Sequence, residues 1–472
     1  VSSASVIPRK VRAISTTSTA RASHYMLLAT IAIGTTLAPL NSTMIAVALP
    51  EIQSAFGVSV TSTAWLVTLY LVAMAVGQPI GGRLGDLYGR RTMYLIGLSG
   101  FAIASLGCVF APNLLWLIVF RTLQALAGAL TFPNGAAMVR DAVPMERRGM
   151  AFGIIGLAAA TAAASGPPLG GALVHAFGWP AIFWANVPVI GIAILLGLRT
   201  LPRHILARSV RSRFDLLGTA LFAMSLSAMI SIPTLLRLEQ AGFAFIAGIV
   251  SVVMGWQFVR HELGITAPVV DMRLFRQPHF AAACASICLS NLVMYTTLLA
   301  IPLFLERVAD RGIQESGFAL AALSAFAAIC GPLGGRWSDR RGRWLPAVAG
   351  GAILFAGTAL LATGAGITGI GVIVVALAIM GLGLGMSGAP VQTAAVEAVP
   401  DAGTGSAAGI FSTARYMGSV VGSTILAMAF VQPRDAENSE RYIALFVILA
   451  VVALAGIMVN SRIADRRAPA PA

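Results

Sequence analysis

The chain has 472 residues, of which 57% are hydrophobic and only 11% are charged. A soluble protein of this length could not cover its surface with so few charged residues, so the composition excludes soluble and disordered proteins. The formal net charge of +14 does not indicate nucleic-acid binding, because the apolar residues fall in blocks long enough to cross a bilayer. We predict an all-α polytopic membrane protein.

The chain begins with a basic stretch at 1–24, which lacks the apolar core of a signal peptide and is expected to be a cytoplasmic N-terminal tail. Apolar blocks of about 18 to 27 residues follow, each long enough to span a hydrocarbon core of about 30 Å. A short cytoplasmic C-terminal tail is expected at 463–472. The fourteen predicted spans lie near 25–50, 62–82, 92–111, 114–138, 150–174, 179–199, 214–236, 242–260, 279–305, 316–335, 345–363, 367–390, 404–430 and 442–461.

The basic residues test this count, because cytoplasmic loops of membrane proteins are enriched in Arg and Lys. With the N terminus in the cytoplasm, most of the 32 basic residues fall in loops on the cytoplasmic side. Two of them, Arg121 and Arg415, lie within spans. We therefore expect a multi-pass protein of the cell inner membrane with both termini cytoplasmic. The basic residues on the opposite side are Arg237, Arg307, Arg311, Arg434 and Arg441.

The sequence repeats itself at a distance of about 250 residues. GGRLGDLYGRR at 81–91 is echoed by GGRWSDRRGR at 334–343, and PNGAAMVRDAVPMERRGMAFGI at 133–154 is echoed by PVQTAAVEAVPDAGTGSAAGI at 390–410. Parallel six-helix repeats are a transporter architecture with the substrate site between the two halves.

The repeat divides the chain into two bundles with an insertion between them. We predict an N-terminal six-helix bundle at 25–200, a linker with two inserted helices at 201–262, and a C-terminal six-helix bundle at 263–462.

These motifs resemble those of the major facilitator superfamily, in its fourteen-helix branch of drug:proton antiporters. The segment 81–91 is similar to the signature loop between helices two and three, RTLQALAG at 121–128 to the fourth-helix signature, and SGPPLGG at 165–171 to the fifth-helix signature of antiporters. Ala125 stands where the fourth-helix signature usually has glycine. The segments that indicate the branch are LNSTMIAVALP at 40–50, GWPAIFWANVP at 178–188 and PVVDMRLFR at 268–276.

The resemblance implies the major facilitator fold, with two parallel six-helix bundles plus two inserted helices. It also implies a secondary active transporter that exports small amphipathic or lipophilic molecules by alternating access, driven by a proton gradient and without a cofactor. The expected partners are a small-molecule substrate and the lipid bilayer, and we expect a monomer. A facilitator or metabolite carrier without proton coupling is the alternative.

The repeated turns are candidates for a gate. Glycines there allow close backbone approach and positive φ, and Asp86 can face the positive end of another helix while Arg90 and Arg91 anchor to the anionic leaflet. The loop at 391–405 has no basic residue, so we expect Asp86 at the start of the thirteenth helix; by the repeat, Asp339 faces the start of the fifth. A merely solvated turn is the alternative. The predicted gating residues are Gly82, Asp86, Gly89, Arg90, Arg91, Gly335, Asp339, Gly342 and Arg343.

The fifth span carries a candidate hinge. Pro167 and Pro168 remove two backbone donors and bend a helix, and small residues allow close packing. We expect this bend to form a hinge against the second half, with ordinary helix packing as the alternative. The predicted hinge residues are Gly166, Pro167, Gly170 and Gly171.

Polar residues within four spans are candidates for substrate contact. The resemblance implies that the first, fourth, ninth and twelfth helices line the cavity. For any single Asn, Gln or Thr, a hydrogen bond between helices is an equally good interpretation. The candidates for substrate binding or coupling are Asn41, Thr43, Arg121, Gln124, Asn291, Tyr295, Thr296 and Gln392.

Proton antiport usually needs a carboxylate within the membrane, yet all 18 acidic residues lie at span ends or in loops. The resemblance implies an aspartate where this chain has Asn41. Glu306, at the outer end of the ninth helix, is the nearest substitute, with a wetted helix end as the alternative. The absent carboxylate is the reason to keep an uncoupled carrier as the second hypothesis.

Asn41 and Arg121 are expected at one depth. Asn41 is about nine residues, roughly 13 Å, from the outer end of its helix, and Arg121 is about eight residues, roughly 12 Å, from the outer start of its own. A buried guanidinium without a carboxylate needs neutral acceptors, such as the amides of Asn41 and Gln124, water or the substrate. Such a cavity favours anionic, zwitterionic or neutral substrates over lipophilic cations.

The histidines, the cysteines and the absence of nucleotide-binding motifs argue against an enzyme, a metalloprotein or an ATP-driven pump. The five histidines lie at span ends or in loops without a catalytic or metal-ligand spacing, so we expect neither an enzyme nor a metal site. Cys284 and Cys288 share a helical face, where a structural pair is the favoured interpretation. The sequence contains no phosphate-binding loop, so we do not expect ATP to drive the protein. A membrane sensor or scaffold would need a large domain outside the membrane, and we expect none between the predicted spans.

Overall fold

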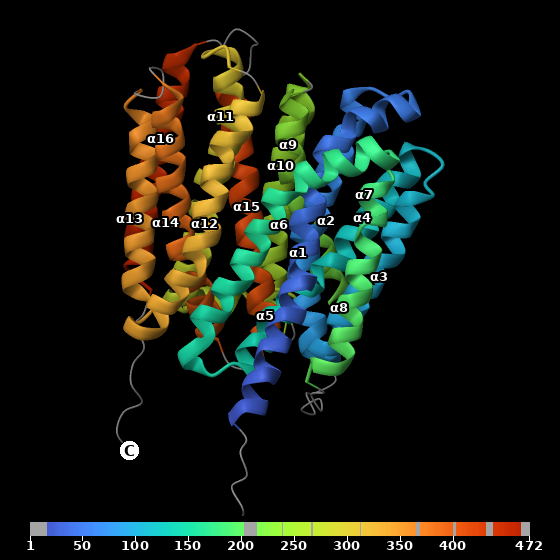
Figure 1. The fold of residues 1–472 in the computed structure, drawn as a ribbon, viewed down its shortest axis with the longest axis vertical. Helices are drawn as coiled ribbons and strands as arrows, with labels where there is room; N and C mark the ends of the chain where they lie inside the picture. Colours follow the sequence, from blue (N-terminus) through green and yellow to red (C-terminus); the bar gives the residue numbers. More distant parts are fainter. Residues whose placement is uncertain are drawn as a thin grey trace, which may run out of the picture.

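A computed structural model describes residues 17–202, 215–237, 239–265, 268–311, 313–364, 369–399, 403–430 and 438–463. Every regular element in these ranges is helical (Figure 1). Thirteen of the helical segments are long and apolar enough to cross a membrane. The prediction of an all-α, multi-pass membrane protein is therefore confirmed.

The first half contains six membrane-spanning segments, of which two are interrupted. The fourth span breaks between α4 and α5 at Leu130, and the sixth breaks between α7 and α8 at Ala185. The helix α1 starts before the predicted position 25. The bounds are α1 Thr17–Phe56, α2 Val60–Tyr88, α3 Arg90–Val109, α4 Leu114–Ala129, α5 Thr131–Ala142, η1 Met145–Arg147, α6 Arg148–Phe177, α7 Ala181–Trp184 and α8 Asn186–Thr200.

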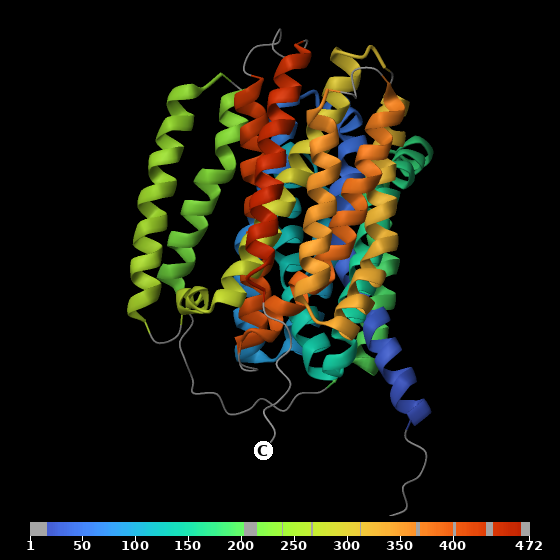
Figure 2. The same cartoon turned by 90° about the vertical axis from the view of Figure 1, so that its left-hand side faces the viewer.

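The two inserted helices, α9 Leu216–Arg237 and α10 Ala241–Gly264, form an antiparallel pair beside the two halves (Figure 2). The helix α9 packs against α2 of the first half and α15 of the second, while α10 packs mainly against α9. The pair therefore touches both halves through one of its helices. Most of the predicted linker, residues 203–214, lies outside the described residues, as do most of the predicted tails.

The second half also contains six spans, and a short helix, η2, precedes them. Its helices repeat the arrangement of the first half, as the sequence repeat predicts. The bounds are η2 Met272–Arg276, α11 Pro278–Arg307, α12 Ile313–Arg341, α13 Trp344–Ala362, α14 Ile370–Glu397, α15 Thr404–Ala429 and α16 Ser439–Asn460.

A helix occupies each of the fourteen predicted apolar blocks, but α15 is less apolar than the thirteen that could cross a membrane by length and composition. The reason is its composition, since several Ser, Thr and Gly residues and Arg415 lower its hydropathy. Because α15 packs against α2, α11 and α9, it faces other helices more than lipid. A helix that is shielded by its neighbours can carry more polar residues than one that faces hydrocarbon.

The two halves meet along two helix pairs, α6 with α12 and α2 with α15. At both contacts the backbones touch through glycines. A Cβ added at Gly82 would collide with the carbonyl oxygen of Gly405, and one added at Gly335 would collide with that of Gly149. Only glycine permits such an approach. We call the end of the molecule that carries these glycine contacts, where α2 meets α3 and α12 meets α13, the basic side.

This packing predicts that adding one methyl group destabilises the protein at a glycine of the interface but not at a glycine in open space. The change Gly335→Ala should destabilise the interface between the halves by about 1–3 kcal/mol, because the added carbon overlaps backbone that cannot move aside. The variant should show a lower apparent melting temperature in detergent. The matched change Gly156→Ala, where a Cβ would meet nothing within 4 Å, should leave it unchanged. Equal melting temperatures for both variants would contradict this account.

Candidate functional site

Asp86, near the end of α2, binds the N terminus of α15 in the other half. Its Oδ1 accepts a hydrogen bond from the Gly405 N–H at 3.2 Å, and its Oδ2 accepts one from the Ser406 N–H at 2.9 Å. The side chain is only 3% exposed. The first N–H groups of a helix have no partner within the helix and carry partial positive charge, so a carboxylate there is stabilised.

Asp339, near the end of α12, makes the equivalent contact in the reverse direction. Its two carboxylate oxygens accept hydrogen bonds from the N–H groups of Gly149, at 2.9 Å, and Met150, at 2.8 Å, in the first turn of α6. Both contacts between the halves lie where the sequence predicts them. They show that the two halves are joined on the basic side in this conformation.

An arginine four residues further on holds each aspartate. Arg90 pairs with Asp86 at 3.1 Å and also with Asp141, and Arg343 pairs with Asp339 at 2.9 Å and with Glu397 at 3.1 Å. Each half thus contains one arginine between two carboxylates. Because the side chain of Arg343 is 2% exposed, its charge is compensated almost entirely by protein.

The arginines of the first turn, for which we predicted contact with the anionic leaflet, both have partners within the protein. Arg90 forms ion pairs with Asp86 and Asp141, and Arg91 donates a hydrogen bond to the carbonyl oxygen of Leu198 at 2.7 Å. The turns themselves use Gly89 and Gly342, with φ of 99° and 92°, which is the backbone conformation that favours glycine.

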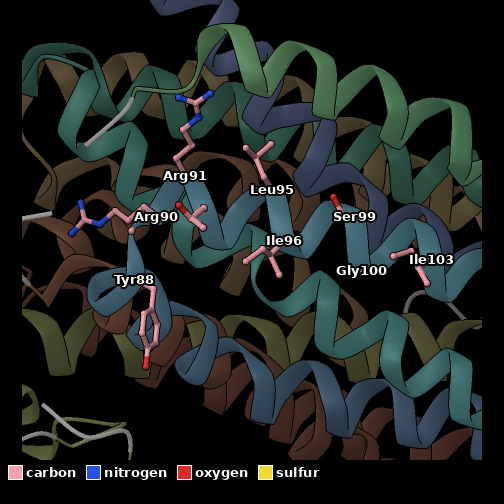
Figure 3. Close-up of a pocket in the computed structure, with 10 residues that line it drawn as sticks. Tyr88, Arg90, Arg91, Leu95, Ile96, Ser99, Gly100 and Ile103 are labelled. Carbon is pink, nitrogen blue, oxygen red and sulfur yellow. The ribbon is translucent and has the colours of Figure 1, made fainter. Parts of the chain in front are cut away.

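The turn after α2 borders a shallow groove of 720 Å³ along α3, shown in Figure 3. The groove is lined by Arg90 and Arg91 at one end and by apolar residues such as Ile96 and Ile103 along its length. Both isoleucines are exposed, as expected for side chains that face the bilayer. The groove thus belongs to the lipid-facing surface rather than to the interface between the halves.

Arg121 is buried in the first half, with 1% of its surface exposed. It donates to the Gln124 Oε1 at 2.5 Å and to the backbone carbonyl of Asn41 at 3.2 Å. The Tyr70 ring lies 4.0 Å from its guanidinium carbon, in a cation–π contact. Among the described residues no carboxylate pairs with Arg121, so neutral acceptors and an aromatic ring stabilise its charge without neutralising it.

The structure partly corrects the role expected of Asn41. Asn41 and Arg121 meet at one depth, as predicted, but the contact uses the Asn41 carbonyl oxygen and not its amide. Both amide atoms of Asn41 are buried without a hydrogen-bond partner. The carbonyl can accept this bond in addition to its helical one, because a carbonyl oxygen has two lone pairs. The amide therefore remains available beside a buried cation.

Gln124 extends this cluster by a chain of hydrogen bonds. Its Nε2 donates to the Ser105 Oγ at 2.7 Å, and Ser105 donates in turn to the carbonyl oxygen of Phe101 at 2.7 Å. This chain holds the Gln124 oxygen toward Arg121. Sequence reasoning did not find Ser105, because one serine in an apolar span has no distinguishing signal.

The other cavity candidates do not join this cluster. Thr43, Asn291 and Thr296 each donate to a carbonyl of their own helix, and Gln392 lies buried in α14. Tyr295 lines a separate cavity between four helices.

Glu306, proposed for coupling, is exposed at the end of α11, opposite the basic side. Its exposed side chain fits its interpretation as a wetted helix end.

The predicted hinge residues Gly166 and Gly170 pack against the first half and not against the second. A Cβ at Gly166 would meet Thr43, and one at Gly170 would meet Met44, both in α1 of the same half. The helix α6 continues through Pro167 and Pro168 without interruption. The expectation that Gly166, Pro167, Gly170 and Gly171 face the second half is thus wrong at least for the two buried glycines; Gly149 and Gly153 make that contact instead.

The comparisons with known proteins agree with this geometry. The family model described as Major Facilitator Superfamily matches residues 31–423. The chain belongs to the major facilitator superfamily, a family of transporters. It is 36% identical to YvkA of Bacillus subtilis, an uncharacterized MFS-type transporter, over 93% of this chain and 95% of the relative. It is 33% identical to the multidrug resistance protein Stp of Mycobacterium tuberculosis, over 82% and 72% of the two chains.

A solved structure shows the same fold. The human organic anion transporter MFSD10 (TETRAN) superposes with a TM-score of 0.67 at 15% identity, over 93% of this chain and 99% of that one. At this identity the likeness concerns the fold alone. The prediction of a major facilitator fold is confirmed.

The contacts of Asp86 lead to a prediction for this transporter. The change Asp86→Asn should abolish transport while the protein still reaches the membrane, because a neutral amide accepts from the α15 N terminus more weakly and no longer pairs with Arg90. Transport into vesicles and the amount of protein in the membrane would be measured together. The change Glu440→Gln, at an exposed residue in the first turn of α16, serves as the control. Normal transport by Asp86→Asn would remove the gating assignment.

Proposed function

We propose that this transporter exports small amphipathic molecules across the cytoplasmic membrane by alternating access, and that its basic side faces the cytoplasm. The observation that carries the proposal is the pair of contacts made by Asp86 and Asp339 across the interface between the halves. These contacts close one side and depend on a few hydrogen bonds, so they can break when the halves tilt apart. Alternating access requires a closure of this kind on each side of the substrate site in turn.

Export is the direction that the relatives favour. Stp carries the name of a multidrug resistance protein and matches most of this chain. The cytoplasmic position of the basic side is supported by the distribution of arginines, which gather in the loops at that end. A substrate would then bind from the cytoplasm when the Asp86 and Asp339 contacts are broken and leave when they are formed.

Proton coupling is the less supported part of the proposal. Asp86, Asp339 and Glu262 are poorly exposed carboxylates, but all three lie toward the basic side rather than beside Arg121. The group next to Arg121 is Asn41, which does not titrate. A carrier without proton coupling is therefore the second candidate, and the neutral surroundings of Arg121 favour it.

Transport in inverted membrane vesicles would test the proposal and separate the two candidates. The probes are three dyes of different charge: cationic ethidium, neutral Nile red and anionic 8-anilinonaphthalene-1-sulfonate. Export predicts accumulation of at least one dye, with the anionic and neutral dyes preferred over ethidium, because the buried cluster carries a net positive charge. Proton antiport predicts that collapsing the pH gradient removes accumulation. Accumulation that persists would decide for the uncoupled carrier, and accumulation of none would contradict export of amphipathic dyes.

A change at Asn41 should convert this cluster into a titratable one. The change Asn41→Asp places a carboxylate beside Arg121, so dye transport should become more dependent on pH and preference should shift toward ethidium, roughly tenfold for a change of about 1.4 kcal/mol. The change Asn41→Leu keeps the volume without a titratable group and should show neither effect. If Asn41→Asp leaves the pH profile and the dye preference unchanged, Asn41 does not face the coupling site.

A further inference from the structure

The inserted helix α9 lies against the seam between the halves. On the basic side, α2 and α15 touch directly, with Gly82 against Gly405 and Gly409 against the backbone of Gln78. Farther along, Leu226 and Ile230 of α9 join Val420 of α15 in one apolar cluster with residues of α2. The helix α9 thus covers the seam where α2 and α15 no longer touch through glycines.

A cavity of about 180 Å³ remains beneath α9. It is lined by Leu71 of α2, Ile230 and Thr234 of α9, Tyr295 of α11 and Tyr416 of α15, among others. Both halves and the inserted pair therefore contribute to one cavity. No charged side chain lines it.

The polar groups of the cavity are hydroxyls. The hydroxyls of Thr68 in α2 and Thr234 in α9 lie 3.3 Å apart and form a hydrogen bond between these two helices. The hydroxyls of Tyr295 and Tyr416 have no hydrogen-bond partner in the described part of the chain. A phenol O–H inside a largely apolar cavity is a donor that a ligand with an acceptor atom would satisfy.

The size of the cavity limits what it can hold. Drug-sized ligands occupy pockets of about 300–1,000 Å³. An engineered cavity of about 150 Å³ in another protein binds benzene, so 180 Å³ suits one aromatic ring with a small substituent. The occupant is then a single ring or the ring-bearing end of a larger molecule.

The cavity adjoins the buried arginine cluster. Tyr416 packs in the same cluster as Tyr70, whose ring lies 4.0 Å from the Arg121 guanidinium carbon. Two tyrosines thus separate the cavity from Arg121. A molecule with a ring in the cavity could extend toward the centre of the transporter if Tyr70 and Tyr416 move apart.

From this arrangement we propose that the cavity binds a neutral aromatic ring that carries a hydrogen-bond acceptor, with α9 as the wall on the membrane side. The tyrosine hydroxyls donate to the acceptor, and Leu71 and Ile230 contact the ring. The proposal rests on the proposed function in that the ring belongs to a transported molecule. It gives the inserted helices a part in substrate binding.

Protection of a cysteine tests the binding without any transport. The variant Thr234→Cys, in full-length protein in lipid nanodiscs, would be labelled with N-ethylmaleimide, with the wild type as the baseline for the native cysteines. Acetophenone, which carries a carbonyl acceptor, should slow labelling at least fivefold. Ethylbenzene, which has nearly the same shape and no acceptor, should slow it less than twofold.

Three further variants exclude simpler explanations of the protection. Met224→Cys lies on an exposed part of α9, and its labelling should not respond to acetophenone. Filling the cavity with Ile230→Trp in the Thr234→Cys background should remove the protection, whereas Ile249→Trp on the exposed face of α10 should keep it. Equal slowing at positions 224 and 234 would show partition into the bilayer only and would overturn the proposal, as would the absence of slowing.

The tyrosines provide a second readout. Tyr295→Phe and Tyr416→Phe together should abolish the difference between acetophenone and ethylbenzene while some protection by both rings remains. A difference that persists would overturn the assigned donors. Dye export without protection would refute the cavity alone, and protection without dye export would refute the proposed function alone.

Discussion

The closed interface depends on placing two carboxylates at two helix N termini within a membrane protein. Asp86 and Asp339 satisfy N–H groups that no helix can satisfy by itself, and the N–H groups in turn compensate charges that would be costly to bury. The contact is possible only because glycines bring the two backbones together beside it. Electrostatics and packing therefore select the same arrangement, and neither would hold without the other.

The same principle governs Arg121 in a different way. A guanidinium in the interior of a bundle needs acceptors at most of its N–H groups. Here Gln124, the Asn41 carbonyl and the Tyr70 ring stabilise the guanidinium without neutralising it, so the cluster keeps a full positive charge. The contrast with Arg343, which lies between two carboxylates, shows that one chain uses buried arginines for two purposes. One pairs charges at an interface, and the other maintains a charge in the interior.

Much of the fold could be predicted from sequence because the bilayer restricts the choices. Apolar length and the positions of arginines predict the helix count. The absence of basic residues at 391–405 predicts the partner of Asp86, and the repeat extends that prediction to Asp339. The Asn41 contact through a carbonyl could not be predicted, because backbone acceptors carry no residue signature. The contact of Gly166 with α1 could not be predicted either, since glycine spacing indicates close packing but not which helix is the partner. The position of α9 against both α2 and α15 could not be predicted either, because it depends on tertiary contacts that no local sequence pattern encodes.

The attachment of the inserted pair has a consequence for assembly. The helix α9 packs on α2, which precedes it in the chain, and on α15, which follows it after five further membrane-spanning helices. During synthesis, α9 can dock on α2 at once, but its second contact surface must remain in lipid until α15 is inserted. Leu226 and Ile230 on that surface are apolar and tolerate the delay. The inserted pair can therefore pack against the first half before the second half is inserted, and α15 can then pack against the surface of α9 that is still exposed to lipid.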